Sequence, residues 1–387
     1  MIAAPSSTLR LAFSGMVGMA VAMGIGRFVF TPILPLMMEG LGLSPTDAGW
    51  IASANYLGYL VGAFAAAGGW GAGRERQLML IALAASAVLA AIMGLTNSVV
   101  VFLIVRFLAG VASAFVMVFL ASIVFSHLAA SGQTHLQSIH FAGVGVGIAV
   151  SSLMMAWLLS MQAPWQEAWF GAAFLSLLGF CFVAFTLKVG PVQQADGSRT
   201  EPPLPRDPAL IRLIIAYGLF GFGYIVTATF LVAIVRQGDG GRIFEAVVWL
   251  VTGIAIIPSI HLWGKLAKKR GIISAYIIGC LVEVVGVAAS VLLGGWIGPI
   301  LAGLLLGGTF VAVTAYGLQA GRVLAPQSPR RALALMTAAF GVGQIIGPIV
   351  AGQLAHSTGS YFLPSLLAAF VLLVSAAFVW PDRRAVT

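Results

Sequence analysis

Residues 9–38 read LRLAFSGMVGMAVAMGIGRFVFTPILPLMM, an apolar run that holds Arg27 near its middle. A helix that crosses a bilayer needs about 20 apolar residues, so this run is long enough to span one. It is too long for a cleavable signal peptide, and no small-residue cleavage site follows it. An arginine at the bilayer centre costs about 3 kcal/mol or more. We therefore expect a partner group, or a ligand that needs a positive charge, to compensate Arg27.

The composition of the whole chain extends this interpretation. The 387 residues are 60% hydrophobic and 8% charged, with a mean hydropathy of +1.04. A soluble domain is roughly a quarter charged and about half apolar. The sequence therefore predicts an all-α polytopic membrane protein embedded in a lipid bilayer. The two cysteines, Cys181 and Cys280, both lie in apolar runs and suggest no disulfide framework.

Apolar runs of this length recur along the chain and predict twelve transmembrane helices. They cover residues 9–38, 46–68, 77–96, 99–127, 138–161, 165–188, 208–235, 243–265, 272–294, 297–322, 331–355 and 360–380. The only substantial linker, GPVQQADGSRTEPPLPRD at 190–207, is rich in proline, glycine and charge. We expect it to divide an N-terminal six-helix bundle, residues 1–189, from a C-terminal one, residues 208–387.

The positive charges indicate an orientation. Of the 20 lysines and arginines, sixteen fall on one side of this topology, and only Arg236 and Arg242 fall on the other. Arg27 and Arg106 lie inside helices. The positive-inside rule places the linker and both termini in the cytoplasm, with Asp47 and Asp239 outside, in a cell inner membrane. The net charge of +9 then reflects topology and does not predict a nucleic-acid partner.

The two halves repeat each other. GGWGAGRER at 68–76 resembles GKLAKKRG at 264–271, and GVGVG at 143–147 resembles GQIIGP at 343–348. Glycines four apart let helices approach closely, so packing alone is one interpretation of them. We also expect Gly69 and Gly264 to lie where two helices nearly touch. Repeated bundles around a site at the membrane midplane are typical of secondary transporters.

These features resemble the major facilitator superfamily over essentially the whole chain. The basic loops resemble its cytoplasmic gate loops, with gate residues Gly69, Arg74, Gly264, Lys268 and Arg270, although Gly73 and Lys268 stand where the family usually has aspartate. RFLAG at 106–110 resembles the arginine motif in the fourth helix of this superfamily. GQIIGPIVAG at 343–352 resembles its proline-glycine motif. MGIGRFVFTPILPLM at 23–37 with ANYLGYLVGA at 54–63 is similar to the YbfB/YjiJ-type subfamily. The resemblance implies a transporter with helices one, four, seven and ten around a central cavity.

Polar residues inside the predicted helices are the candidate substrate-binding groups: Arg27, Thr31, Asn55, Tyr56, Tyr59, Arg106, Tyr217, Tyr224, Tyr316 and Gln319. Two buried arginines without an evident acid beside them favour an anionic small-molecule substrate, since arginine binds carboxylates through two hydrogen bonds. We expect tyrosine or asparagine groups to hold Arg27 when the site is empty. Alternatively, Arg27 caps backbone carbonyls near a helix break at Thr31-Pro32, and Arg106 has a gating or purely structural role.

Two further residues are candidates for proton coupling, His140 and Glu283. Each also has a simpler interpretation, His140 as a packed neutral histidine and Glu283 as a protonated acid hydrogen-bonded to a neighbouring helix. The sequence contains no phosphate-binding loop, no metal-ligand spacing and no convincing nucleophile-base pair. We expect no enzyme activity, no cofactor and no metal.

These observations favour a monomeric secondary transporter that moves a small organic anion by proton symport or by exchange, and the arginines favour a carboxylate. A multidrug efflux pump for amphipathic compounds is the alternative. A non-transporting membrane sensor is a third hypothesis, less favoured because no soluble domain accompanies the helices.

Overall fold

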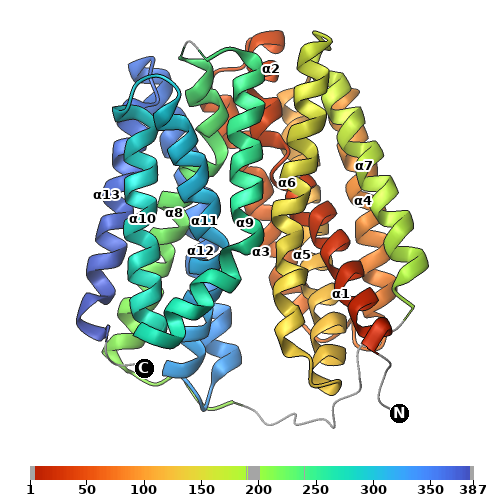
Figure 1. The fold of residues 1–387 in the computed structure, drawn as a ribbon, viewed down its shortest axis with the longest axis vertical. Helices are drawn as coiled ribbons and strands as arrows, with labels where there is room; N and C mark the ends of the chain where they lie inside the picture. Colours follow the sequence, from red (N-terminus) through yellow and green to blue (C-terminus); the bar gives the residue numbers. More distant parts are fainter. Residues whose placement is uncertain (1–4, 189, 191–200, 239, 384–387) are drawn as a thin grey trace. The chain divides into compact units, whose positions relative to one another are not determined.

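The computed structural model describes residues 5–188, 190, 201–238 and 240–383; most of the linker and Asp239 lie outside them. The described residues form helices joined by short turns and contain no strand, which confirms the predicted fold class (Figure 1). By their contacts they divide into a first unit, Met1–Gly42 with Ala54–Asp196, and a second unit, Leu43–Ser53 with Gly197–Thr387.

The first unit is built from six predicted spans, the first of them broken. Its elements are α1 (Pro5–Met19), the π-helix η1 (Ala20–Ile25), α2 (Phe30–Leu41), the greater part of α3 (Pro45–Ala67), α4 (Glu75–Gly94), α5 (Val99–Ala130), the short η2 (Thr134–Leu136), α6 (Gln137–Ser160) and α7 (Trp165–Thr186). The bounds of α3 to α7 agree with the predicted spans to within three residues.

The second unit contains the other six spans and the beginning of α3. Its helices are α8 (Pro208–Arg236), α9 (Arg242–Arg270), α10 (Ile272–Leu292), α11 (Ile297–Leu324), α12 (Pro329–Thr358), α13 (Phe362–Val379) and the short η3 (Trp380–Asp382). The Asp207 carboxylate accepts a hydrogen bond from the Ala209 N–H at 2.9 Å, and Pro208 occupies the first helical turn. A cap followed by proline fixes the start of α8 where the sequence predicts it.

The start of α3 belongs with the second unit because it packs on α12. The Ser53 hydroxyl donates to the Ile345 carbonyl at 2.7 Å. Gly49 and Gly352 lie at the same contact. A Cβ at Gly49 would clash with the backbone of Pro348, and a Cβ at Gly352 would clash with the backbone of Pro45. Small residues therefore allow backbone-to-backbone packing here.

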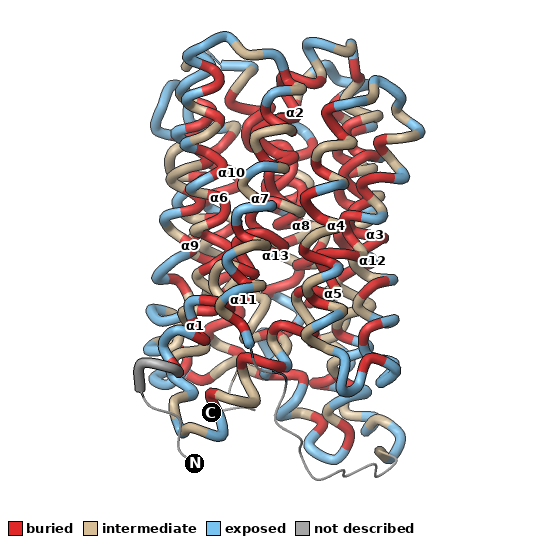
Figure 2. The backbone as a smooth tube through the Cα atoms, turned by 90° about the vertical axis from the view of Figure 1, so that its right-hand side faces the viewer, coloured by how far each residue is buried: buried red, intermediate tan, exposed pale blue. Residues whose placement is uncertain are grey.

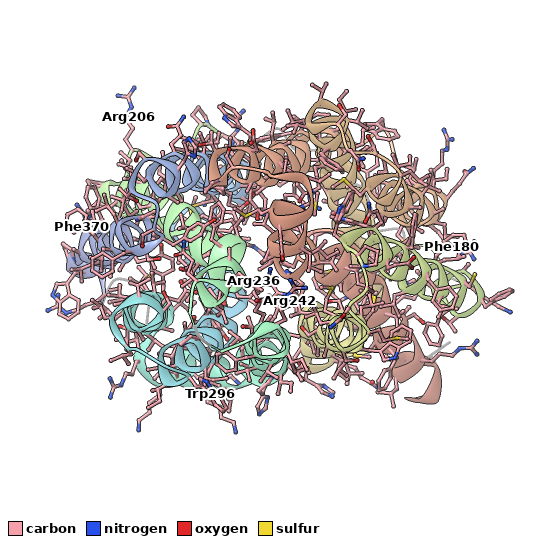
Figure 3. The ribbon with its side chains drawn as sticks, turned by 90° about the horizontal axis from the view of Figure 1, so that it is seen from above. Phe180, Arg206, Arg236, Arg242, Trp296 and Phe370 are labelled. Atoms are coloured by element: carbon pink, nitrogen blue, oxygen red, sulfur yellow. The ribbon has the colours of Figure 1, made fainter. Side chains whose placement is uncertain are left out.

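Eleven helical segments of the described residues are long and apolar enough to cross a membrane, with α1, η1 and α2 counted as one. The twelfth helix, α3, is 23 residues long and carries Asp47, Asn55 and two tyrosines. Exposed and buried positions alternate along the helices (Figure 2). Many exposed side chains are large and apolar, such as Trp296 (68% exposed) and Phe370 (62%) at the edge of the second unit (Figure 3). Such surfaces suit lipid rather than water.

The first span is interrupted at Gly26–Val29. Gly24 and Gly26 favour the irregular backbone, and the last turn before the break is a π-helix, a form common at functional sites. The chain resumes as α2 at Phe30, so Pro32 falls in its first turn, where a missing N–H costs little. The break therefore lies just before the Thr31-Pro32 position at which we expected it.

The repeated glycine motifs make equivalent contacts in each unit. In α6, a Cβ at Gly143 would meet the Met16 carbonyl of α1, and one at Gly147 would meet the Ala20 carbonyl. In α12, a Cβ at Gly343 would meet the Gly218 carbonyl of α8. The fifth and eleventh predicted helices thus use the same motif to pack on the first and the seventh. This confirms the packing interpretation of these glycines.

Candidate functional site

Arg27 lies in the break of the first span, against three aromatic rings. Its side chain is only 3% exposed. The guanidinium carbon is 4.4 Å from the ring centre of Tyr59, 4.9 Å from that of Tyr56 and 5.7 Å from that of Phe28. Ring faces attract a cation within about 6 Å. We call Arg27, Phe28, Tyr56 and Tyr59 the arginine cage, in which two tyrosine rings contact the guanidinium.

The cage leaves part of the guanidinium without a hydrogen bond. Its Nε and Nη2 atoms are buried and have no hydrogen-bond partner, and no carboxylate of the described residues pairs with Arg27. Buried donors are nearly always satisfied in folded proteins, so unpaired ones call for an explanation. A bound acceptor would supply one.

Arg106, on α5, takes the carbonyl-capping role that we considered for Arg27. Its Nη1 donates to the Gly26 carbonyl and its Nη2 to the Arg27 carbonyl, both at 3.1 Å. The guanidinium also packs on the Phe30 ring at 4.9 Å. Asn55 in turn donates from Nδ2 to the Arg106 carbonyl at 3.0 Å, and Thr31 is buried beside the break. Arg106 and Asn55 therefore fix the backbone that presents Arg27.

The second unit holds a stack of aromatic rings formed by Tyr217, Phe220, Tyr224, Phe310 and Phe340. The Tyr224 ring lies 5.5 Å from Phe310 at an interplanar angle of 9° and 5.6 Å from Phe340 at 11°. The Tyr224 hydroxyl accepts a hydrogen bond from Gln344 of α12, a residue that we did not single out from the sequence. We call these five rings the aromatic stack. It brings two predicted site residues, Tyr217 and Tyr224, together.

The two candidate substrate-binding residues on α11 have different surroundings. The Tyr316 hydroxyl donates to the Ile260 carbonyl of α9 at 3.4 Å, and Gln319 is exposed. A Cβ at Gly264 would lie 3.2 Å from the Tyr316 hydroxyl oxygen. Tyr316 therefore belongs to the contact between α9 and α11.

The gate-loop residues differ from one another. Gly69 has φ +75°, a conformation that favours glycine, and a Cβ there would find no described atom within 4 Å. The prediction that Gly69 marks a close helix contact is therefore wrong, and the turn itself requires glycine. At Gly264 the neighbouring group is the Tyr316 side chain of α11 and not its backbone, so the close helix contact there stays a prediction. Arg74, Lys268 and Arg270 are exposed, whereas the neighbouring Arg76 donates to the carbonyls of Leu187, at 2.5 Å, and Ala184, at 3.0 Å.

His140 and Glu283 are both fully buried. His140, on α6, packs against the rings of Phe125 and Phe141, and neither ring nitrogen has a hydrogen-bond partner. Glu283, on α10, has one carboxyl oxygen 2.9 Å from the Thr309 hydroxyl of α11. In the part of the chain that the structure describes, no group of three histidine, cysteine or acidic residues could hold a metal ion.

Comparison with known proteins identifies the family. The family sequence model described as "Uncharacterised MFS-type transporter YbfB" matches residues 19–380. The chain belongs to this family of the major facilitator superfamily. It is 27% identical over 385 residues to the "Chloramphenicol resistance protein" of Streptomyces lividans, covering 92% of this chain and 93% of that protein.

Solved transporter structures share the fold. An aspartate-to-alanine mutant of the nucleoside transporter NupG has a TM-score of 0.76 at 15% identity, covering 96% of this chain and 98% of the other. A bacterial homologue of the human lysosomal transporter Spinster, in an inward-facing and occupied conformation, has a TM-score of 0.75 at 14% identity. The match covers 99% of this chain and 98% of the other. The chain is thus a multi-pass membrane protein of the transporter type, as its family and its fold agree.

Proposed function

We propose that this YbfB-type chain is a secondary active transporter of a small organic anion, most simply a carboxylate, which Arg27 binds. The observation that carries the proposal is the arginine cage, a buried guanidinium held by ring faces with two nitrogens left unbonded. A carboxylate accepts two parallel hydrogen bonds from such a fork. Cation–π contact restrains the guanidinium plane and leaves its edge available.

The other candidates divide by what they touch. Tyr56 and Tyr59 orient the cation, and Thr31 is buried in the first turn of α2, just after the break. Arg106 and Asn55 are positioning residues, since their side chains donate hydrogen bonds to backbone carbonyls. In the second unit, Tyr217 and Tyr224 remain candidates for substrate contact. Tyr316 and Gln319 remain weaker candidates for substrate contact.

We also propose a transport cycle and a membrane orientation for this chain. Residues 1–189 and 208–387 form two bundles that alternate access to the substrate, and 190–207 with both termini faces the cytoplasm from the inner membrane. The loops around Gly69 and Arg74 and around Gly264, Lys268 and Arg270 act as gates. Proton symport or exchange drives the cycle of a monomer.

The test is uptake of radiolabelled benzoate, lactate and succinate by proteoliposomes that contain the purified protein. Arg27→Ala should abolish saturable uptake of the accepted anion. Arg27→Lys keeps the charge but loses the planar fork, so we expect KM to rise about tenfold, equivalent to about 1.4 kcal/mol. Arg10→Lys, an exposed position on α1, is the matched control. A folded Arg27→Ala protein with unchanged KM would show that Arg27 is structural.

Efflux of amphipathic compounds is the second candidate. The aromatic stack favours flat apolar molecules, and the relative from Streptomyces lividans bears the name of a chloramphenicol resistance protein. Expression in a drug-sensitive host should then raise resistance to chloramphenicol or to dyes, and Tyr224→Ala should lower it. The anion hypothesis predicts uptake without resistance, and a non-transporting sensor predicts neither.

A further inference from the structure

Glu283 is a buried acid that the proposed anion site does not use. Its side chain on α10 is 0% exposed, and α10 packs against α9, α11 and α13. Among the described residues, no lysine, arginine or histidine pairs with it. Burying an ionised carboxylate without a partner is very costly, and such a group usually stays neutral instead.

A count of hydroxyl protons points to the same protonation state. The Thr309 oxygen lies 2.6 Å from the Leu305 carbonyl of its own helix and 2.9 Å from the Glu283 carboxyl. A threonine hydroxyl has one proton to donate, and the shorter contact to the carbonyl one turn earlier takes it. The contact with Glu283 then needs a proton from the acid, whose O–H donates to the Thr309 oxygen.

Among the described residues around Glu283 we find no competing base. On its own helix the titratable neighbours are Cys280 and Tyr276, and the Tyr276 hydroxyl lies 2.9 Å from the Ser375 hydroxyl of α13. Tyr217 of α8 contributes a ring 6.5 Å from that of Tyr276. From α11 the contact is Thr309, which does not titrate, and no charged side chain described on α8, α9, α11 or α13 bonds to Glu283. Cysteine and tyrosine ordinarily lose protons at higher pH than a carboxyl group.

We propose that Glu283 is the proton-binding site of this transporter, and that its protonated carboxyl joins α10 to Thr309 of α11. This inference rests on the proposed transport function. When Glu283 releases its proton to water, the electron pair stays on the carboxylate, which then faces apolar packing. The contact between α10 and α11 must open to water, or Thr309 must turn its hydroxyl away from Leu305 to donate to the anion.

The position of Thr309 links this event to the aromatic stack. Phe310 is the next residue of α11, and its ring stacks on Tyr224, which accepts a hydrogen bond from Gln344. A displacement of α11 on proton release therefore moves a ring of the stack. His140 has no such link, because its ring nitrogens have no hydrogen-bond partner among the described residues and its ring packs against Phe125 and Phe141.

Infrared spectroscopy of the purified protein in lipid nanodiscs tests the protonation state without a substrate. At neutral pH we expect a carbonyl band of a protonated carboxylic acid that Glu283→Gln removes and Cys280→Ser, the matched control, retains. Thr309→Val should shift this band to higher frequency, since the acid loses its hydrogen-bond acceptor. A band unaffected by Glu283→Gln, or no shift in Thr309→Val, would overturn the proposal.

Transport measurements separate this inference from the function on which it rests. With an anion accepted in the benzoate, lactate and succinate assay, Glu283→Gln should lose proton-driven accumulation, at least tenfold, yet retain exchange between labelled and unlabelled anion. Full accumulation by folded Glu283→Gln would refute the proton site while the role of Arg27 stands. An infrared band with the expected behaviour, together with unchanged KM in Arg27→Ala, would instead refute the anion site alone.

Discussion

Replacing Arg106 with lysine gives a direct test of how the break in the first span is held. The two carbonyls at the break, of Gly26 and Arg27, each accept a hydrogen bond from one arm of the Arg106 fork. In a regular helix the N–H of Thr31 would donate to the Arg27 carbonyl, but here it donates to the Phe28 carbonyl at 3.2 Å. A lysine ammonium keeps the charge but has no planar fork to span both carbonyls.

The size of the effect follows from the bonds that are lost. A hydrogen bond to a charged group contributes about 1.5–3 kcal/mol in soluble proteins, whereas interhelical hydrogen bonds within membranes average about 0.6 and reach about 1.7 kcal/mol. Arg106→Lys loses one such bond and the flat contact with Phe30. We therefore expect a loss of about 1–2 kcal/mol in the free energy of unfolding. Arg106→Met is less informative, because it also removes the cost of a buried charge.

Reversible unfolding by sodium dodecyl sulfate in mixed micelles, followed by tryptophan fluorescence, measures this difference. Arg10→Lys on α1 is the control, since Arg10 is exposed. The same variant should also weaken anion binding, because the backbone that presents Arg27 is no longer fixed. Unfolding of Arg106→Lys at the same detergent fraction as the unmodified protein would refute the capping role.

Four further outcomes are expected. Burial raises the pKa of Glu201, but hydrogen bonds from the N–H groups of Arg331 and Arg330 and from the Arg330 side chain outweigh it, so the pKa lies below its ordinary value. The stabilisation that Glu201 gives to the start of α12 is thus complete at neutral pH and is lost as the pH falls through the lowered pKa. In that acidic range, amide hydrogen exchange at 329–336 should accelerate. Glu201→Gln should remove this pH dependence of exchange. Gly147→Leu should prevent folding, seen as loss of the monodisperse peak in size-exclusion chromatography, because the new side chain meets the backbone at Ala20. Gly264→Leu should fold but slow uptake by its contact with Tyr316; normal rates would remove the gate interpretation. Gln193→Cys, without Cys181 and Cys280, should react with impermeant maleimide only in inverted vesicles, and labelling of intact cells would contradict the orientation.

The helices could be predicted from the sequence because apolar length is a strong signal. Asp207 and Pro208 even fix the first residue of α8. The spacing of the glycines likewise predicts packing, and in α6 and α12 the structure agrees. In the gate loop a glycine is present for another reason, since the left-handed backbone conformation at Gly69 favours glycine. A glycine in a sequence does not reveal which of the two physical reasons applies.

The exchange of roles between the two arginines could not be predicted. Both lie in apolar runs, and either could reach carbonyls freed by a helix break. The break falls at Gly26–Val29 rather than at Thr31-Pro32, and the carbonyls of Gly26 and Arg27 accept hydrogen bonds from Arg106 of α5. Arg106 therefore caps the break with both of its terminal nitrogens, whereas Arg27 keeps both Nε and Nη2 without a partner.

Gln344 shows where the sequence carried a signal that we did not use. It lies inside GQIIGP, whose glycines explain the motif through packing on α8. A glutamine in an apolar helix needs a partner, however, since an unsatisfied amide in hydrocarbon costs several kcal/mol. Its partner is the Tyr224 hydroxyl, which places a second polar contact at the aromatic stack. A motif explained by its small residues can therefore still contain a polar side chain with its own role. In this chain that side chain connects α12 to Tyr224, whose ring stacks on Phe310, the residue that follows Thr309.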